Sequence, residues 1–170
     1  GKDFVQVAGS FNNYSPTSSH LMKQDPNTGK FWLEIDNLTS GQIETYQYWV
    51  FDQTPITNSP TLVKTADPFS SLVLSPFDDP YIPATSYPNI PTYPAGQERE
   101  VTVLQTGQTP YNWVVPNFQA PKEEDLIVYE VLARDFDENR NYQDLIDRID
   151  YFKNLNINAI QLMPIMEFDG

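Results

Sequence analysis

The stretch "NYQDLIDRIDYFKNLNINAIQLMPI" at residues 141–165 decides how the C-terminal part of the chain folds. Asn141 can cap the start of a helix. Apolar side chains then recur with the 3.6-residue period of a helix that buries one face, at Leu145, Ile146, Ile149, Phe152 and Leu155. Asn156 stands where a helix often ends in the left-handed conformation. The run "INAIQLMPI" at 157–165 then predicts a buried strand.

A second buried strand is predicted before this helix. The run "LIVYEVLARDF" at residues 126–136 is nearly continuously apolar, which is typical of a strand covered on both faces of a parallel sheet. Strand, helix and strand together predict one βαβ unit with a right-handed crossover. A dinucleotide-binding fold is disfavoured, because the turn "ARDFDENRN" at 133–141 has three acidic residues and no glycine, whereas a pyrophosphate needs a close approach to backbone amides.

The N-terminal part of the chain has the pattern of short, half-buried strands. Apolar side chains alternate with other residues, at Val5 and Val7, at Phe31, Leu33 and Ile35, and at Tyr46, Tyr48 and Val50. Turn residues in "DPNTGK" (25–30) and "LTSGQ" (38–42) separate these runs. "REVTVLQTG" at 99–107 predicts a last strand. An antiparallel sandwich is therefore expected.

A proline-rich connection follows the first strands. The stretch "PFDDPYIPATSYPNIPTYP" at 76–94 holds six prolines. Each lacks a backbone donor and fixes φ, so the stretch can form neither a helix nor a central strand. We expect an extended crossing, with Tyr81, Tyr87 and Tyr93 packed on the surface of the sandwich.

Length, charge and composition exclude several classes of protein. The chain has 170 residues, enough for one domain and part of another. Its net charge is −13 with no basic stripe, so nucleic acid is not an expected partner. The chain has no cysteine, which excludes thiol chemistry. Its apolar runs are far shorter than the roughly 20 residues that span a bilayer.

The C-terminal part resembles a known family. "VYEVLARDF", the helix, and "FKNLNINAIQLMPIMEF" resemble the first strand, first helix and second strand of the catalytic (β/α)₈ barrel of the α-amylase superfamily, glycoside hydrolase family 13. The likeness is greatest to its branching-enzyme, pullulanase and maltooligosyltrehalose-hydrolase-like members. In those the second strand reads like "GVTAIELMP", and here Asn156 stands where they have glycine. A left-handed position tolerates this change.

The N-terminal part resembles a module that precedes this barrel in many such enzymes. "VAGSFNNYSP", "FWLEIDNL", "YQYWVFD" and "KTADPFS" are similar to the immunoglobulin-like starch-binding module, carbohydrate-binding module family 48. The expected fold is thus an immunoglobulin-like β-sandwich followed by a truncated α/β unit of a TIM barrel. Residues 1–118 would form the sandwich with its proline-rich connection. Residues 119–170 would form the first strand, helix and second strand of the barrel.

The resemblance implies a retaining glycosidase whose catalytic residues lie elsewhere. A carboxylate nucleophile and a carboxylic general acid do the chemistry, and the family carries them on the fourth and fifth barrel strands. They are therefore expected C-terminal to Gly170, and the chain alone should hydrolyse nothing. Asp135, Asp137 and Glu138 follow the first strand, but they are more consistent with loop and helix-start acids. No metal ligand cluster and no cofactor are expected.

Three aromatic residues are candidates for carbohydrate binding: Tyr14, Trp32 and Trp49. Flat aromatic faces stack on sugar rings, and in starch-binding modules a Trp ends the stretch "GSFNNW" and a Lys lies in a later strand. Here Tyr14 and Gln47 take these two positions, which favours a supporting role over autonomous binding. Trp32 and Trp49 fall opposite their core-directed neighbours, where packing against another segment competes with sugar stacking.

The leading hypothesis is the N-terminal portion of a secreted or cell-surface enzyme that hydrolyses or transfers α-glucans. Its location would be extracellular, periplasmic or at the cell surface, although no signal peptide is visible. The alternative is a non-catalytic carbohydrate-binding or cell-surface adhesion module. Strands 126–133 and 157–165 would have open edges and apolar faces, so we expect self-association through them, or partial disorder past residue 120. The sequence leaves open whether the enzyme cleaves α-1,4 or α-1,6 bonds.

Overall fold

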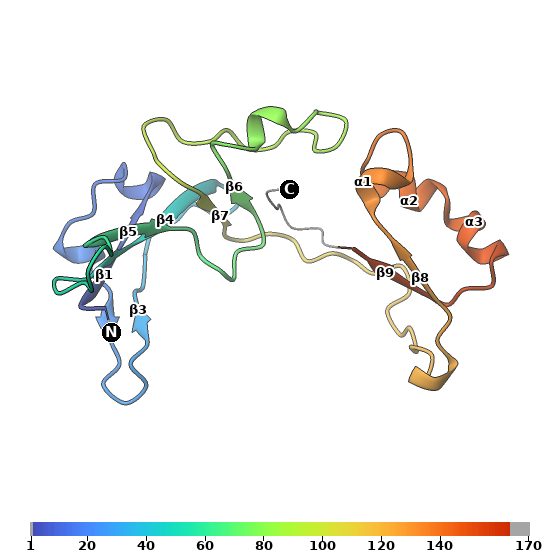
Figure 1. Ribbon diagram of the computed structural model, residues 1–170, viewed down its shortest axis with the longest axis horizontal. Helices are drawn as coiled ribbons and strands as arrows, with labels where there is room; N and C mark the ends of the chain where they lie inside the picture. The colour runs from blue at the N-terminus through green and yellow to red at the C-terminus, as the bar shows by residue number, and fades with distance from the viewer. Residues whose placement is uncertain (1, 164–170) are drawn as a thin grey trace. The chain divides into compact units, whose positions relative to one another are not determined.

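The structure is a computed structural model that describes residues 2–163 of the chain. It divides into two compact units, whose elements are labelled in Figure 1. Unit 1 holds the residues up to Tyr81 together with Pro91–Pro110, and unit 2 holds Ile82–Ile90 and the residues from Tyr111 on. The α-helices lie in unit 2. The expected boundary between residues 118 and 119 stays a prediction.

Unit 1 is built around one antiparallel sheet. Its strand order is β1-β4-β7-β6, and β5 also pairs with β4. The strands of the sheet are β1 (Phe4–Gly9), β4 (Ile43–Phe51), β5 (Leu62–Thr65), β6 (Val73–Leu74) and β7 (Val101–Gln105). A separate hairpin contains β2 (Lys23–Gln24) and β3 (Phe31–Trp32), and the 3₁₀ turns are η1 (Ser10–Asn12), η2 (Ser18–His20) and η3 (Asp79–Tyr81). This content is consistent with a β-sandwich-like domain.

Strand β4 is the centre of the sheet. One edge pairs with β1 from Tyr46 to Phe51. The other edge is shared, because β7 pairs with Ile43–Tyr46 and β5 pairs with Tyr48–Phe51. The register places Val7 opposite Tyr48. The expected alternation in these two strands is thus confirmed, with its apolar positions on one face of the sheet.

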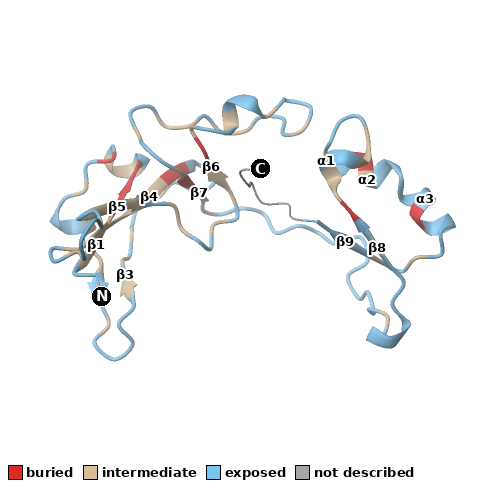
Figure 2. Ribbon diagram, in the orientation of Figure 1, coloured by how far each residue is buried: buried red, intermediate tan, exposed pale blue. Residues whose placement is uncertain are grey.

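Both faces of this sheet carry buried side chains near its middle, and Figure 2 colours the buried stretches red. Val7 is 3% exposed on the face that also carries Tyr46 and Tyr48. Ala8 and Gln47 are 0% exposed on the opposite face. A sheet buried on both faces needs a second layer on each side, and here loops supply much of it.

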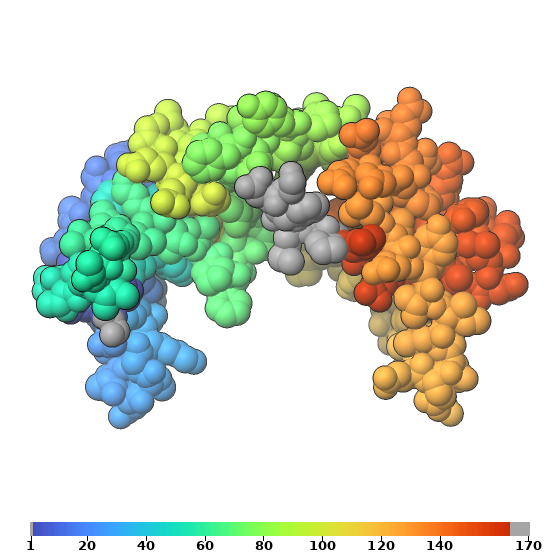
Figure 3. Space-filling model, viewed as in Figure 1, coloured from blue at the N-terminus to red at the C-terminus, as the bar shows by residue number. Residues whose placement is uncertain are grey.

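The predicted strand at Phe31, Leu33 and Ile35 is shorter than expected. β3 ends at Trp32 because β2 offers only two residues for pairing. Alternation of side chains indicates which way each residue faces, but it does not provide a partner strand. The loop between β2 and β3 projects from the rest of unit 1 in Figure 3.

The proline-rich crossing has neither a strand nor an α-helix between residues 76 and 94, as expected. Tyr93 donates its hydroxyl to the carbonyl of Arg99 at 2.6 Å. The prediction that Tyr81 packs on the sandwich is wrong, since Tyr81 is 85% exposed. Its orientation is set by η3, which its N–H closes on the carbonyl of Asp78 at 2.9 Å. Tyr87 belongs to unit 2.

Unit 2 contains the predicted βαβ arrangement. β8 (Val128–Val131) and β9 (Ala159–Leu162) pair in parallel. Between them lie α1 (Ala133–Phe136), α2 (Tyr142–Asp147) and α3 (Ile149–Asn154), and η4 (Glu123–Asp125) precedes β8. Only β8 and β9 form this parallel sheet in the described part of the chain. Pro164 and Ile165, the end of the predicted second strand, lie outside the described residues.

The predicted helix signals are confirmed, with one interruption. The side chain of Asn141 accepts the N–H of Asp144 at 3.1 Å, and Asn156 has φ 56°. The helix breaks at Arg148, with φ −99° and ψ 15°. Burial of both faces of the strands is not seen among the described residues. Val131 is 5% exposed, but Val128 is 50% exposed, because the helices cover one face only.

Candidate functional site

Tyr14, a predicted sugar-binding residue, lies in a buried position. It is 9% exposed, and its hydroxyl donates to the hydroxyl of Thr45 at 2.7 Å. Burial raises the pKa of Tyr14 above its ordinary value, although the bond to Thr45 acts against this. Its backbone is left-handed, with φ 52°. The ring thus packs against the sheet and offers little free surface.

The two tryptophans lie in different surroundings. Trp32 is 47% exposed in the hairpin, and the Nζ of Lys23 lies 4.8 Å from its ring centroid. Trp49 is half-buried in β4, and the Nζ of Lys64 lies 4.8 Å from its ring centroid. Cations at this distance are attracted by the ring face. No ring contact or hydrogen bond joins Tyr14, Trp32 and Trp49 within residues 2–163. Their role in sugar binding stays a prediction.

The sequence did not indicate that Lys64 lies beside Trp49, or that Glu98 pairs with Lys64. The pairing of β4 with β5 places Lys64 directly opposite Trp49. Lys64 also forms an ion pair with Glu98 at 3.2 Å. Finding these residues would have required the pairing partner of β4, and the short strand β5 has no strong pattern. The ammonium of Lys64 lies over the ring where a sugar would stack.

Gln47, compared above with a lysine of starch-binding modules, makes structural contacts. Its side chain is 0% exposed. The amide Nε2 donates to the carbonyl of Glu98 at 2.7 Å and to that of Glu100 at 2.9 Å. Its Oε1 lies 3.4 Å from the indole Nε1 of Trp49. Gln47 therefore holds the segment before β7 against the sheet.

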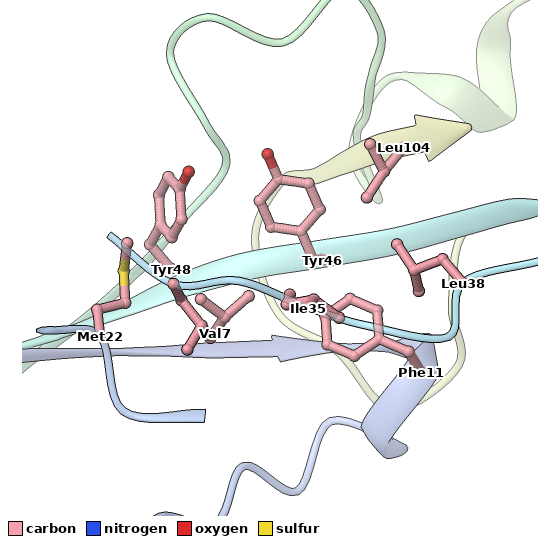
Figure 4. A pocket seen from close by; sticks show the side chains of 9 residues that line it. Val7, Phe11, Met22, Ile35, Leu38, Tyr46, Tyr48 and Leu104 are labelled. Atoms are coloured by element: carbon pink, nitrogen blue, oxygen red, sulfur yellow. The ribbon is translucent and has the colours of Figure 1, made fainter. Parts of the chain in front are cut away.

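The opposite face of the same sheet borders an apolar pocket, shown in Figure 4. The pocket has a volume of about 240 Å³. Its walls come from β1, η1, the residue before β2, the segment after β3, β4 and β7. They are made by Val7, Phe11, Met22, Leu33, Ile35, Leu38, Tyr46, Tyr48 and Leu104. The hydroxyls of Tyr46 and Tyr48 are the only polar side-chain groups among these nine residues. Such a lining suits an apolar or aromatic group and offers few partners to sugar hydroxyls.

Asp67 holds both of these hydroxyls. Tyr46 and Tyr48 each donate to its Oδ2 at 2.9 Å. The N–H of Phe69 donates to Oδ1 at 2.8 Å. Partial burial acts to raise the pKa of Asp67, but these three donors outweigh it and the pKa lies below the ordinary value. Burial and the carboxylate raise the pKa of Tyr46 well above its ordinary value.

Replacing Asp67 by Asn should lower the free energy of unfolding at pH 7 by about 1–2 kcal/mol, because charge-assisted hydrogen bonds become neutral ones. The folded pKa of Asp67 is depressed, so its contribution is present above the unfolded pKa of about 3.9 and is lost as the pH falls through the folded pKa. Urea denaturation at pH 7 and pH 3 measures the free energy of unfolding. Its decrease from pH 7 to pH 3 should be smaller for the variant than for the wild type. Asp36→Asn, at an exposed site, is the matched control. An equal decrease in the free energy of unfolding between pH 7 and pH 3 for Asp67→Asn and wild type would contradict the prediction.

Two of the three acids that follow β8 are paired with arginines. The Nε of Arg134 lies 3.1 Å from a carboxylate oxygen of Asp135. The Nε of Arg148 lies 2.7 Å from Oδ2 of Asp137, and this bond lowers the pKa of Asp137. Glu138 uses its N–H to contact Asp137. These contacts fit the interpretation of loop acids.

Two further observations concern metal binding and the crossing of a membrane. Residues 2–163 hold no group of three or more His, Cys, Asp or Glu side chains that could bind a metal ion. Within the same residues no helix is both long and apolar enough to cross a membrane.

Parts of the chain are similar to three characterised proteins. A malto-oligosyltrehalose trehalohydrolase of Saccharolobus solfataricus is 33% identical over 60 residues, 35% of this chain and 11% of the relative. That of Deinococcus radiodurans is 31% identical over 77 residues, 45% of this chain and 12% of the relative. Alpha-amylase 3 of Dictyoglomus thermophilum is 43% identical over 56 residues, 30% of this chain and 11% of the relative.

The similarity is partial. The matched stretches span only 11–12% of the length of these relatives. No protein-family model matches the chain.

Proposed function

We propose that the chain is the N-terminal portion of an α-glucan-active glycoside hydrolase or transglycosylase of the α-amylase family. The observation that carries this is the parallel pairing of β8 with β9 through α-helices, in a chain with stretches similar to two malto-oligosyltrehalose trehalohydrolases and an α-amylase. Parallel strands joined by helices are the repeating unit of a (β/α)₈ barrel. β8 and β9 would be its first two strands.

In this proposal the two units have different roles. Unit 1, as an immunoglobulin-like module, would support the barrel. The retaining mechanism needs a nucleophile and a general acid about 5–5.5 Å apart, and these would lie C-terminal to Gly170. The arginine-paired acids after β8 are not assigned a catalytic role. The complete protein would act outside the cell, in the periplasm or at the cell surface, without a cofactor.

The proposal is tested by comparing the complete protein with the 170-residue chain. We expect the complete protein to release reducing ends from amylose or pullulan, or to release trehalose from malto-oligosyltrehalose. The chain alone should release neither. A complete protein without activity on any of these α-glucans would reject the proposal, and turnover by the chain alone would reject the placement of the catalytic acids.

A non-catalytic carbohydrate-binding or adhesion module is the second candidate, favoured by the exposure of Trp32. We expect titration with maltoheptaose to leave the tryptophan fluorescence unchanged at millimolar sugar, since Tyr14 is buried and Lys64 covers Trp49. Quenching that is lost in Trp32→Ala would support this candidate instead. Trp113→Ala, in unit 2, is the matched control.

Self-association of the chain is part of the same proposal. Val128, Ile160 and Leu162 of the parallel pair are 50%, 40% and 41% exposed. Apolar faces and open strand edges favour pairing with another copy. Sedimentation velocity should therefore show a dimer at micromolar concentration, and a monomer at all concentrations would contradict this.

A further inference from the structure

The segment after β3 is an unpaired strand edge. In residues 33–36, which we call the open segment, no backbone N–H or C=O is hydrogen-bonded to another described residue. Leu33 and Ile35 contribute to the apolar pocket, whereas Glu34 and Asp36 are exposed. Asn37 ends the segment with a left-handed backbone, φ 64°. The segment thus has the alternation of a strand without the hydrogen bonds of one, which makes it a template for an added strand.

The pocket lies directly beside the open segment, between it and the sheet, as Figure 4 shows for Ile35. Its volume of about 240 Å³ exceeds the roughly 150 Å³ of an apolar cavity that binds benzene. Strand addition takes its affinity from main-chain hydrogen bonds and its specificity from pockets for alternate side chains. The open segment and the pocket together supply both components.

The acidic side chains of the open segment indicate which kind of partner strand it would bind. Neither Glu34 nor Asp36 has a side-chain hydrogen bond or ion pair with another described residue. A cross-strand pair of side chains stabilises two neighbouring strands when the charges differ in sign, and destabilises them when the charges have the same sign. A second copy of the chain would bring the same two acids and a net charge of −13. Charge complementarity therefore favours a basic strand over a second copy.

We propose that the open segment and the pocket bind an extended basic peptide segment of a partner protein. The peptide adds as a strand beside residues 33–36. Its Lys or Arg side chains lie opposite Glu34 and Asp36, and one bulky apolar side chain from the other set enters the pocket. This interaction is independent of the proposed action on α-glucans.

The test uses the whole ¹⁵N-labelled chain and two blocked nonapeptides. One peptide alternates Lys and Val with a central Phe for the pocket, and the other has Glu in place of Lys. We expect the Lys peptide to bind at least about tenfold more tightly. Its binding should shift the amide signals of residues 33–36 and slow their hydrogen exchange.

A charge swap and a matched control separate this site from general attraction to an acidic chain. The double variant Glu34→Lys and Asp36→Lys should reverse the preference, so that the Glu peptide binds more tightly. Glu123→Lys with Asp125→Lys has the same residue types, spacing and exposure in η4, and it should leave the preference for the Lys peptide intact. Both variants change exposed side chains, so their folds can be compared by amide spectra.

Several results would overturn the proposal. These are an absence of binding at millimolar peptide, shifts confined to other residues, and equal effects of the two double variants. Protection of the amides of residues 33–36 in the free chain would also overturn it. Protection that rises with concentration would show a second copy at this edge, and constant protection would show that the chain covers the edge itself.

Discussion

Replacing Gln47 by Glu should lower the free energy of unfolding by about 3–4 kcal/mol at pH 7. The Gln47 side chain is 0% exposed, and its amide donates to the carbonyls of Glu98 and Glu100 at 2.7 and 2.9 Å. A carboxylate would direct an acceptor oxygen at two acceptors and would bury a charge without a partner. Gln47→Leu, which leaves the carbonyls unpaired but adds no charge, should cost less, about 2–3 kcal/mol.

The pH dependence separates these two effects. Burial would raise the pKa of the introduced carboxyl above its unfolded value of about 4.3. The folded state then favours the neutral form, so the deficit of the Glu variant is small below the unfolded pKa and grows as the pH rises above it. The deficit of Gln47→Leu should stay constant between pH 4 and 7.

Chemical denaturation followed by circular dichroism measures these differences. Gln53→Glu is the matched control, because Gln53 is exposed and its side chain makes no hydrogen bond within residues 2–163. Its effect should be under about 0.5 kcal/mol. A Gln47→Glu variant within 1 kcal/mol of the wild type at pH 7 would mean that this amide does not hold the segment.

The local signals in the sequence predicted the elements whose cause is local. Asn141 caps its helix because its side chain reaches an N–H three residues on. Asn156 ends the helical stretch because asparagine tolerates a left-handed backbone. The alternation in β4 follows from the pleat of a strand. Each of these requires knowledge of only a few neighbouring residues.

Pairing between distant segments was not predictable in the same way. The pattern at Leu33 and Ile35 is that of a strand, yet these residues find no partner strand among the described residues. Lys64 meets the ring of Trp49 only because β5 shares an edge of β4 with β7. Neither fact leaves a trace in the neighbouring sequence.

The candidate site shows the same division. Gln47 has a polar side chain in a strand, and composition alone would place it at the surface. It is buried because its amide donates hydrogen bonds to carbonyls of a segment about fifty residues further on. Tyr14 was predicted to bind sugar from a motif that presents a flat ring. In the fold its hydroxyl instead donates a hydrogen bond to the hydroxyl of Thr45. The motif therefore predicted a ring at this position, whereas its burial follows from packing that the motif does not encode.

Replacing Phe152 by Ala should cost about 3–5 kcal/mol and unfold the helical part of unit 2. Phe152 is 2% exposed, and its ring centroid lies 5.3 Å from those of both Tyr129 and Phe136. It thus joins α3 to β8 and α1. Val131 is the one other buried apolar side chain among the described residues of unit 2, so little remains to hold the helices once this ring is removed.

Far-UV circular dichroism at 222 nm and amide exchange of α2 and α3 measure the loss. Phe118→Ala makes the same chemical change in unit 2 at a side chain that is 69% exposed, and it should cost under about 0.5 kcal/mol. Unit 1 should keep its stability in both variants, because its buried residues do not include Phe152. Retention of the helical signal and of slow exchange in Phe152→Ala would show that the parallel strand pair, and not this aromatic contact, holds unit 2 together.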